Sequence, residues 1–194
     1  MKRRAVSLLA VALFTIAAWA QGSEWQIDPA HTTVGFSVRH LGISNVHGRF
    51  GKVSGSAMID DTDITKSSVN TTIDVNSIDT GNQNRDSDLK SPNYFDAAQF
   101  PTITFKSKSV NKNGEGKLKV VGDLMIHGVT KEVTLDVEGP SAPAKMGPNQ
   151  HRGLAASTSI NRKDFGVGAK APAAMVGEEI KISLDVELTQ KVAE

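Results

Sequence analysis

Apolar and polar residues alternate in one stretch after another between Trp25 and Leu188. In the closing segment, charged and hydroxyl side chains fall on one face, and the apolar side chains fall on the other, namely Ile180, Ile182, Leu184, Val186 and Leu188. A period of two residues is typical of a β-strand with one buried face and one solvated face. Because the pattern fills most of the chain, the apolar faces must meet around one interior, and a closed barrel leaves no exposed sheet edge.

The alternation and the turn signals between its segments predict eight or nine mostly antiparallel strands. They are expected within residues 25–27, 31–41, 50–59, 69–75, 102–110, 116–127, 129–137, 154–160 and 180–190. Residues 84–90 are expected to form a short helical segment that packs on the barrel through Leu89, Tyr94 and Phe95, and residues 139–149 and 164–177 are expected to be loops.

The mostly short connections favour an all-β, up-and-down barrel over a two-sheet sandwich. Small residues at inward positions also favour a barrel with room inside, and these are Gly55, Ala57, Gly122 and Ala156.

The first twenty residues have the three parts of a secretory signal peptide. Basic residues occupy positions 2–4, an apolar stretch covers residues 5–19, and Ala18-Trp19-Ala20 forms a small-x-small cleavage site. Cleavage after Ala20 would leave residues 21–194 as a single domain and change the net charge from +1 to −2. A near-neutral chain with scattered charges offers no electrostatic footprint for nucleic acid, so we expect no nucleic-acid partner.

The chain contains no cysteine. Its stability must therefore come from a hydrophobic core, for which 174 residues suffice. The same absence excludes thiolate catalysis, iron–sulfur clusters, zinc–thiolate sites and c-type haem attachment, and no cofactor is expected.

The histidines give no local signature of a metal or catalytic site. They are His31, His40, His47, His127 and His151. None stands two residues from another or in a His-Glu-x-x-His arrangement, so a metal site would need residues from distant segments and none is predicted. The Gly-x-Ser-x-Gly pattern of serine hydrolases is also absent, and no catalytic residue is predicted. His31 follows Asp28 by three residues, and the carboxylate could hold the ring in a structural role.

Three arginines stand next to another charged or ring side chain, and the planar guanidinium fork suits an anionic head group. Arg39, His40, Arg85 and Arg162 are therefore candidates for contacts with the polar head of a ligand. The pair Arg85-Asp86 beside a short helix also fits an ordinary capping and surface role.

Four blocks of the sequence resemble the YceI-like polyisoprenoid-binding family. They are WQIDPAHTTVGFSVRHLGISNVHGRFGKVSG at 25–55, NRDSDLKSPNYFDAAQFPTITF at 84–105, VGDLMIHGVTKEVTL at 121–135 and INRKDFGV at 160–167. The resemblance implies an extended, lipocalin-like, eight-stranded antiparallel barrel that holds a long isoprenoid or other lipid, usually in the periplasm. It also suggests a homodimer. Where the family often has a histidine this chain has Asp88, so no role of that histidine carries over.

The leading hypothesis is an exported lipid-binding protein, not an enzyme, that holds a quinone-like or polyprenyl-phosphate-like chain for transport, storage or stress protection. Lipid exchange would involve transient contact with a membrane. The residues expected to line the cavity are Val34, Phe36, Val38, Ile73, Phe105, Leu124, Leu135 and Ile160. Two alternatives stay open. One is an enzyme acting on a lipid, with His40, His127, Asp86 or Arg162 as acid, base or anion-holding group; the other is a ligand-free stress or interaction module.

Overall fold

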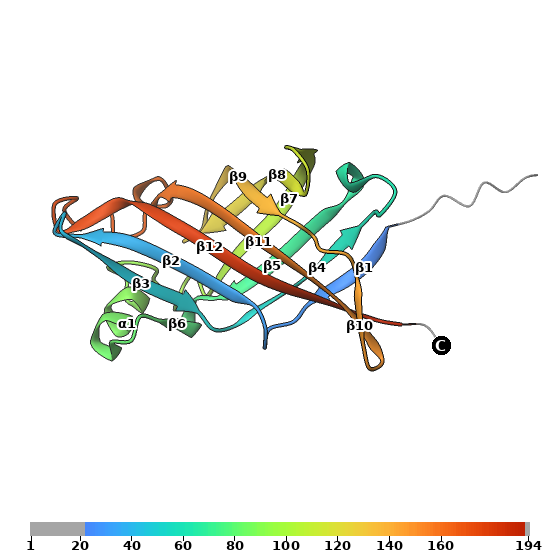
Figure 1. Ribbon diagram of the computed structural model, residues 1–194. Helices are drawn as coiled ribbons and strands as arrows, with labels where there is room; N and C mark the ends of the chain where they lie inside the picture. Colours follow the sequence, from blue (N-terminus) through green and yellow to red (C-terminus); the bar gives the residue numbers. More distant parts are fainter. Residues whose placement is uncertain (1–21, 193–194) are drawn as a thin grey trace, which may run out of the picture.

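The alternating segments form twelve strands of one antiparallel sheet in the computed structural model, which describes residues 22–192 (Figure 1). The strands are β1 Ser23–Ile27, β2 Thr33–His40, β3 Ser44–Phe50, β4 Val53–Ile59, β5 Ser68–Asp74, β6 Ile78–Asp79, β7 Thr102–Lys112, β8 Lys117–Ile126, β9 Val129–Glu138, β10 Ala144–Met146, β11 Asn149–Asn161 and β12 Val176–Lys191. The helices are α1 Gln83–Lys90 and three short 3₁₀ turns, η1 Ile64–Lys66, η2 Val75–Ser77 and η3 Arg162–Phe165. The predicted signal peptide, residues 1–20, lies outside the described residues.

The twelve strands close into an eight-stranded barrel because several short strands lie end to end, and each such pair occupies one position in the barrel. β1 and β2 lie end to end along β12 and share one position. β4 and β3, which pair with β1 and β2, share the next, and β5 and β6, which pair with β4 and β3, share the one after. The ring closes between β11 and β12, which stay in register from Asn149 opposite Lys191 to Asn161 opposite Glu179. The predicted eight-stranded antiparallel barrel with a short helix is therefore confirmed.

Several segments differ from the prediction. The predicted loop 139–149 contains the short strand β10, because Gly147, at a φ of +59°, allows a tight turn that pairs Ala144–Met146 with Asn149–His151. The predicted loop 164–177 ends earlier than expected, since β12 begins at Val176. β3 was not expected as a separate strand because only Val46 and Phe50 are apolar within Ser44–Phe50. β11 begins at Asn149, ahead of the predicted residue 154, because His151 and the inward-facing Arg152 hide the alternation. Among residues 22–192, no helix is long and apolar enough to span a bilayer.

The small inward residues play two different roles. Ala57 and Ala156 do border an interior space. At Gly122, however, an added Cβ would lie 2.5 Å from Cζ of Phe105, so the absent side chain makes room for an aromatic ring. The expectation that every small inward residue enlarges the cavity is therefore wrong for this glycine.

Gly55 is required by the backbone of β4. Its φ is +147°, and an added Cβ would lie 2.1 Å from the carbonyl oxygen of Asn70 on the neighbouring strand. Gly55→Ala should lower the free energy of unfolding by about 2–4 kcal/mol, measured by urea denaturation. Gly153→Ala is the matched control, since nothing lies within 4 Å of a Cβ at that position. Equal stability of the two variants would contradict this description of β4.

Candidate functional site

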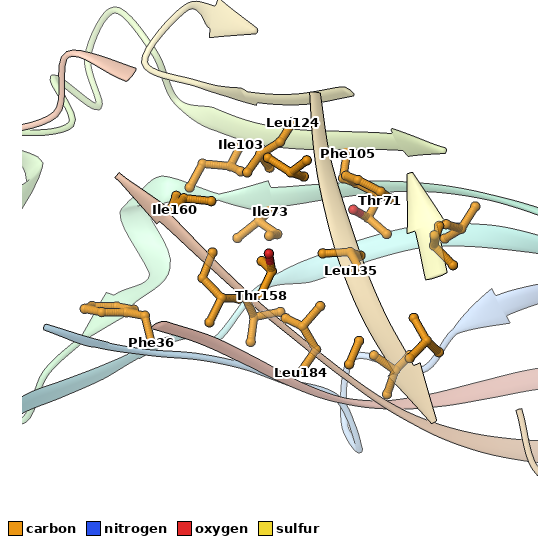
Figure 2. Close-up of a pocket in the computed structure, with 18 of the residues that line it drawn as sticks. Phe36, Thr71, Ile73, Ile103, Phe105, Leu124, Leu135, Thr158, Ile160 and Leu184 are labelled. Atoms are coloured by element: carbon orange, nitrogen blue, oxygen red, sulfur yellow. The ribbon is translucent and has the colours of Figure 1, made fainter. Parts of the chain in front are cut away.

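The inner faces of the barrel strands enclose a cavity of about 280 Å³, counted as the space that the centre of a water-sized molecule can occupy. Its wall is almost entirely aliphatic and aromatic, with side chains converging from opposite strands (Figure 2). The lining side chains that carry nitrogen or oxygen are Ser67, Ser68, Thr71, Tyr94, Thr158 and Arg162. Such a surface favours an apolar occupant, because a polar group buried there would lack hydrogen-bond partners.

All eight residues that the sequence singled out lie in the wall of this cavity. They come from six strands, with Val34, Phe36 and Val38 on β2, Ile73 on β5, Phe105 on β7, Leu124 on β8, Leu135 on β9 and Ile160 on β11. Figure 2 shows six of them facing a common space. Their contact with a ligand remains a prediction.

The cavity wall also includes residues that the list of eight left out. The inward face of β12 contributes Ile180, Ile182, Leu184, Val186 and Leu188. Leu89, Tyr94 and Phe95, from α1 and the segment after it, both line the cavity and pack on the core, as the sequence predicted for their packing. Phe165 and Val167 had no periodic signal, because they lie in a turn whose place is set by tertiary contacts.

Two hydroxyl groups face the middle of the cavity from opposite sides of the barrel (Figure 2). The Thr158 hydroxyl donates to the carbonyl of Thr134 at 2.9 Å. The Thr71 hydroxyl makes no hydrogen bond with other groups in the described part of the chain, so it is available to a polar atom of an occupant.

Arg162 is nearly inaccessible, with 3% of its surface exposed, and its guanidinium is bound by the loop that follows it. Nε donates to the carbonyl of Gly177 at 3.0 Å, and the two terminal nitrogens donate to four more carbonyls, those of Val167, Gly168, Ala171 and Val176. A guanidinium has five N–H donors, and here all five are used within the protein. Arg162 therefore orders the loop over residues 166–177 and has no donor left for a head group.

A surface ion pair supports the base of the same loop. Lys163 Nζ lies 2.7 Å from Glu178 Oε1, and the Asn161 amide donates to the other oxygen. The ammonium of Lys163, followed by the Asn161 hydrogen bond, lowers the pKa of Glu178 below its ordinary value. Because the pair is exposed, its contribution to stability is small.

The other polar candidates lie outside the cavity. Arg39 and His40 are exposed at the end of β2, where Arg39 donates to the side-chain oxygen of Asn45 at 3.2 Å. Arg85 on α1 donates from Nε and a terminal nitrogen to the hydroxyl and carbonyl of Thr80, both at 2.8 Å. The structure thus does not bring these three side chains together with Arg162 into one polar cluster facing the cavity.

The residues considered for catalysis are also separated. His127 occupies the turn between β8 and β9, where its ring packs edge-on against Phe100 at 4.5 Å between centroids. Asp86 accepts hydrogen bonds from the backbone N–H and the hydroxyl of Thr80. Of His40, His127, Asp86 and Arg162, only Arg162 lines the cavity.

Trp25 and Arg152 are buried, at 1% and 6% exposed, but neither lines the cavity. The Arg152 guanidinium lies over the indole ring at 4.8 Å, a cation–π contact, and one terminal nitrogen lies 2.7 Å from both oxygens of Asp61. Arg152 Nε is buried without a hydrogen-bond partner. The aromatic contact and the ion pair offset part of the cost of burying this charge.

The geometry defines the chain as a closed, eight-stranded antiparallel barrel with an apolar interior. The pattern of the YceI-like domain matches residues 25–188, which is nearly the whole described chain. A UPF0312 protein of Vibrio cholerae is 34% identical over 184 residues, covering 94% of this chain and 97% of its own length. The chain belongs to the YceI-like family, as the resemblance indicated.

Solved structures have the same fold. A Campylobacter jejuni YCEI protein is 33% identical, with a TM-score of 0.72 over 85% of this chain and 96% of its own. BcnA of Burkholderia cenocepacia is 27% identical, with a TM-score of 0.73 over 83% of this chain and 98% of its own. A polyisoprenoid binding domain from Saccharophagus degradans, at 16% identity and a TM-score of 0.65, covers 84% of this chain and 97% of its own. At that identity the likeness is one of fold alone.

Proposed function

We propose that the protein binds a long apolar chain of the polyisoprenoid class, such as that of a quinone or a polyprenyl phosphate, and carries or stores it in the periplasm. The observation that carries this proposal is the enclosed cavity with an almost wholly apolar wall. The predicted signal peptide supports the compartment, with residues 21–194 as the exported domain. The fold shared with a polyisoprenoid binding domain supports the ligand class.

The energetics favour a long chain. Burial of one five-carbon isoprene unit contributes about 3–4 kcal/mol, at roughly 0.8 kcal/mol for each buried methylene. Association and ordering cost on the order of 4–15 kcal/mol. Several units are therefore needed for tight binding, and the chain rather than the head group supplies most of the affinity.

Displacement of an environment-sensitive apolar dye by polyprenols of increasing length tests the proposal. Affinity should rise with each added unit until the cavity is filled, and a saturated fatty acid serves as the comparison ligand. Absence of saturable dye binding would instead support a barrel filled by its own side chains. Turnover of a bound lipid that is lost on mutation while binding persists would support an enzyme.

An apolar patch at one end of the barrel fits the membrane contact that lipid exchange needs. Leu41 and Ile43, in the turn between β2 and β3, are 50% and 79% exposed, and Met175 is 53% exposed. The N–H of Leu41 donates to the carbonyl of Met175 at 3.0 Å, so the two segments adjoin. Val176, the next residue, lines the cavity, which places the patch beside one end of the proposed binding site.

Charging this patch should impair lipid transfer. The double variant Leu41→Asp, Ile43→Asp should slow transfer of a fluorescent polyprenyl lipid to phosphatidylethanolamine–phosphatidylglycerol vesicles at least about fivefold, because two apolar insertions are lost. Met146→Asp is the control, since Met146 is 69% exposed on β10 at the other end of the barrel (Figure 1). If both variants transfer lipid alike, the patch has no part in exchange.

A further inference from the structure

Four side chains with metal-binding atoms meet on the outside of the barrel, away from the cavity wall. Asp28 and His31 lie in the turn between β1 and β2, His151 lies on β11, and Glu187 lies on β12. His31 Nδ1 is 2.8 Å from Asp28 Oδ2 and 3.9 Å from Glu187 Oε1. His151 Nδ1 is 2.7 Å from the same Glu187 oxygen. Segments far apart in the sequence thus bring Asp28, His31 and Glu187 to within 4.8 Å of one another, and His151 joins them through its contact with Glu187.

The backbone holds these side chains in place. The N–H of Asp28 donates to the carbonyl of Glu187 at 2.9 Å, and the N–H of Glu187 donates to the Thr32 hydroxyl. The closing ladder of β11 and β12 sets His151 opposite Thr189, next to Gly153 opposite Glu187. Because the backbone fixes the positions of these residues, only their side chains need to rotate to bind an ion.

The charges of the cluster favour a cation. Within residues 22–192, neither Asp28 nor Glu187 forms an ion pair with lysine or arginine. Asp28 is paired with His31 and also accepts from the Ala30 N–H, and Glu187 is paired with His31 and His151.

The spacing also suits a small divalent ion. Ligating atoms of Asp28, His31 and Glu187 all lie within 4.8 Å of one another. In a tetrahedral zinc site with bonds of about 2.0–2.2 Å, ligand atoms lie about 3.3–3.6 Å apart. This separation falls between the 2.7 Å contact of His151 with Glu187 and the 3.9 Å contact of His31 with Glu187. His31 is 65% exposed at its side chain, so an ion can reach the cluster from solvent.

We propose that Asp28, His31, His151 and Glu187 form a binding site for a divalent transition-metal ion of the zinc type. Imidazole and carboxylate ligands suit Zn²⁺ and Cu²⁺, whereas Ca²⁺ and Mg²⁺ prefer sites built wholly of oxygen atoms. The bound ion links the turn between β1 and β2 to strands β11 and β12, which close the barrel. Because binding is restricted to the folded state, it raises the melting temperature.

The test is a titration of tag-free protein with Zn²⁺ against a fluorescent chelator at pH 8, because protons compete less for imidazole ligands as the pH rises. We expect one saturable site, a higher melting temperature with Zn²⁺ than with Mg²⁺, and at least about tenfold weaker binding in both His31→Ala and His151→Ala. His47→Ala, an exposed position on β3, should bind as the parent does.

Two results would overturn the proposal. One is the absence of saturable zinc binding in protein shown to be folded by circular dichroism. The other is binding that His31→Ala and His151→Ala weaken no more than His47→Ala does, which would mean adventitious binding to surface histidines only. Since His31 and His151 lie outside the cavity wall, dye binding by the same variants separates this test from that of the lipid proposal.

Discussion

Arg162→Met should lower the free energy of unfolding by more than about 3 kcal/mol. The variant keeps an apolar stem of similar length but removes donors from five backbone carbonyls that a single guanidinium binds. Those carbonyls become solvated only if the loop over residues 166–177 opens. Urea denaturation measures the loss, and hydrogen exchange should show the faster-exchanging amides concentrated in that loop.

The matched control is Arg39→Met, because Arg39 is exposed and makes one side-chain hydrogen bond, to Asn45. Its effect should stay within about 0.5 kcal/mol. Arg162→Lys should not restore stability, since a single ammonium cannot reproduce a fork of five donors. If Arg162→Met proves as stable as Arg39→Met, the loop does not depend on the buried guanidinium.

Ala156→Phe should reduce retention of an apolar chain at least about tenfold while leaving the barrel folded. Ala156 is buried in the cavity wall, and the new ring places six additional carbon atoms in the space that the proposed ligand occupies. Filling a cavity gains packing contacts, so the melting temperature should not fall if the ring fits without strain. Dye binding and polyprenol displacement measure the effect.

The neighbouring residue gives an unusually close control. Ala155 lies on the same strand but faces outward and is exposed, so Ala155→Phe adds the same ring outside the barrel. This variant should bind apolar ligands as the parent does. Equal binding by the two folded variants would place the ligand elsewhere than in the cavity.

The sequence predicted the barrel because a period of two residues reports burial on one face directly. The same signal placed Phe36 and Phe105 inside, since each stands in an alternating run. It did not distinguish residues that border empty space from residues that fill it. Gly122 gives an example, because the space left by its missing side chain is occupied by the Phe105 ring.

The polar features were harder to predict because they depend on contacts distant in sequence. Arg162 was a candidate for a head group, yet its partners are carbonyls of a loop with no periodic pattern. His31 and His151 are separated by most of the chain, and only the closure of β11 on β12 brings both to Glu187. Barrel closure, not local spacing, creates these clusters.

The central claim, that the barrel holds an apolar chain, is tested most directly by mass spectrometry of lipid extracted from protein purified from the periplasm without detergent, alongside a mock preparation. The account predicts an isoprenoid in stoichiometric amount, which would also give the chain length. A fatty acid or other lipid would keep the binding role and overturn the ligand class. Protein that carries no lipid, and that fails to take up added polyprenol, would contradict the claim.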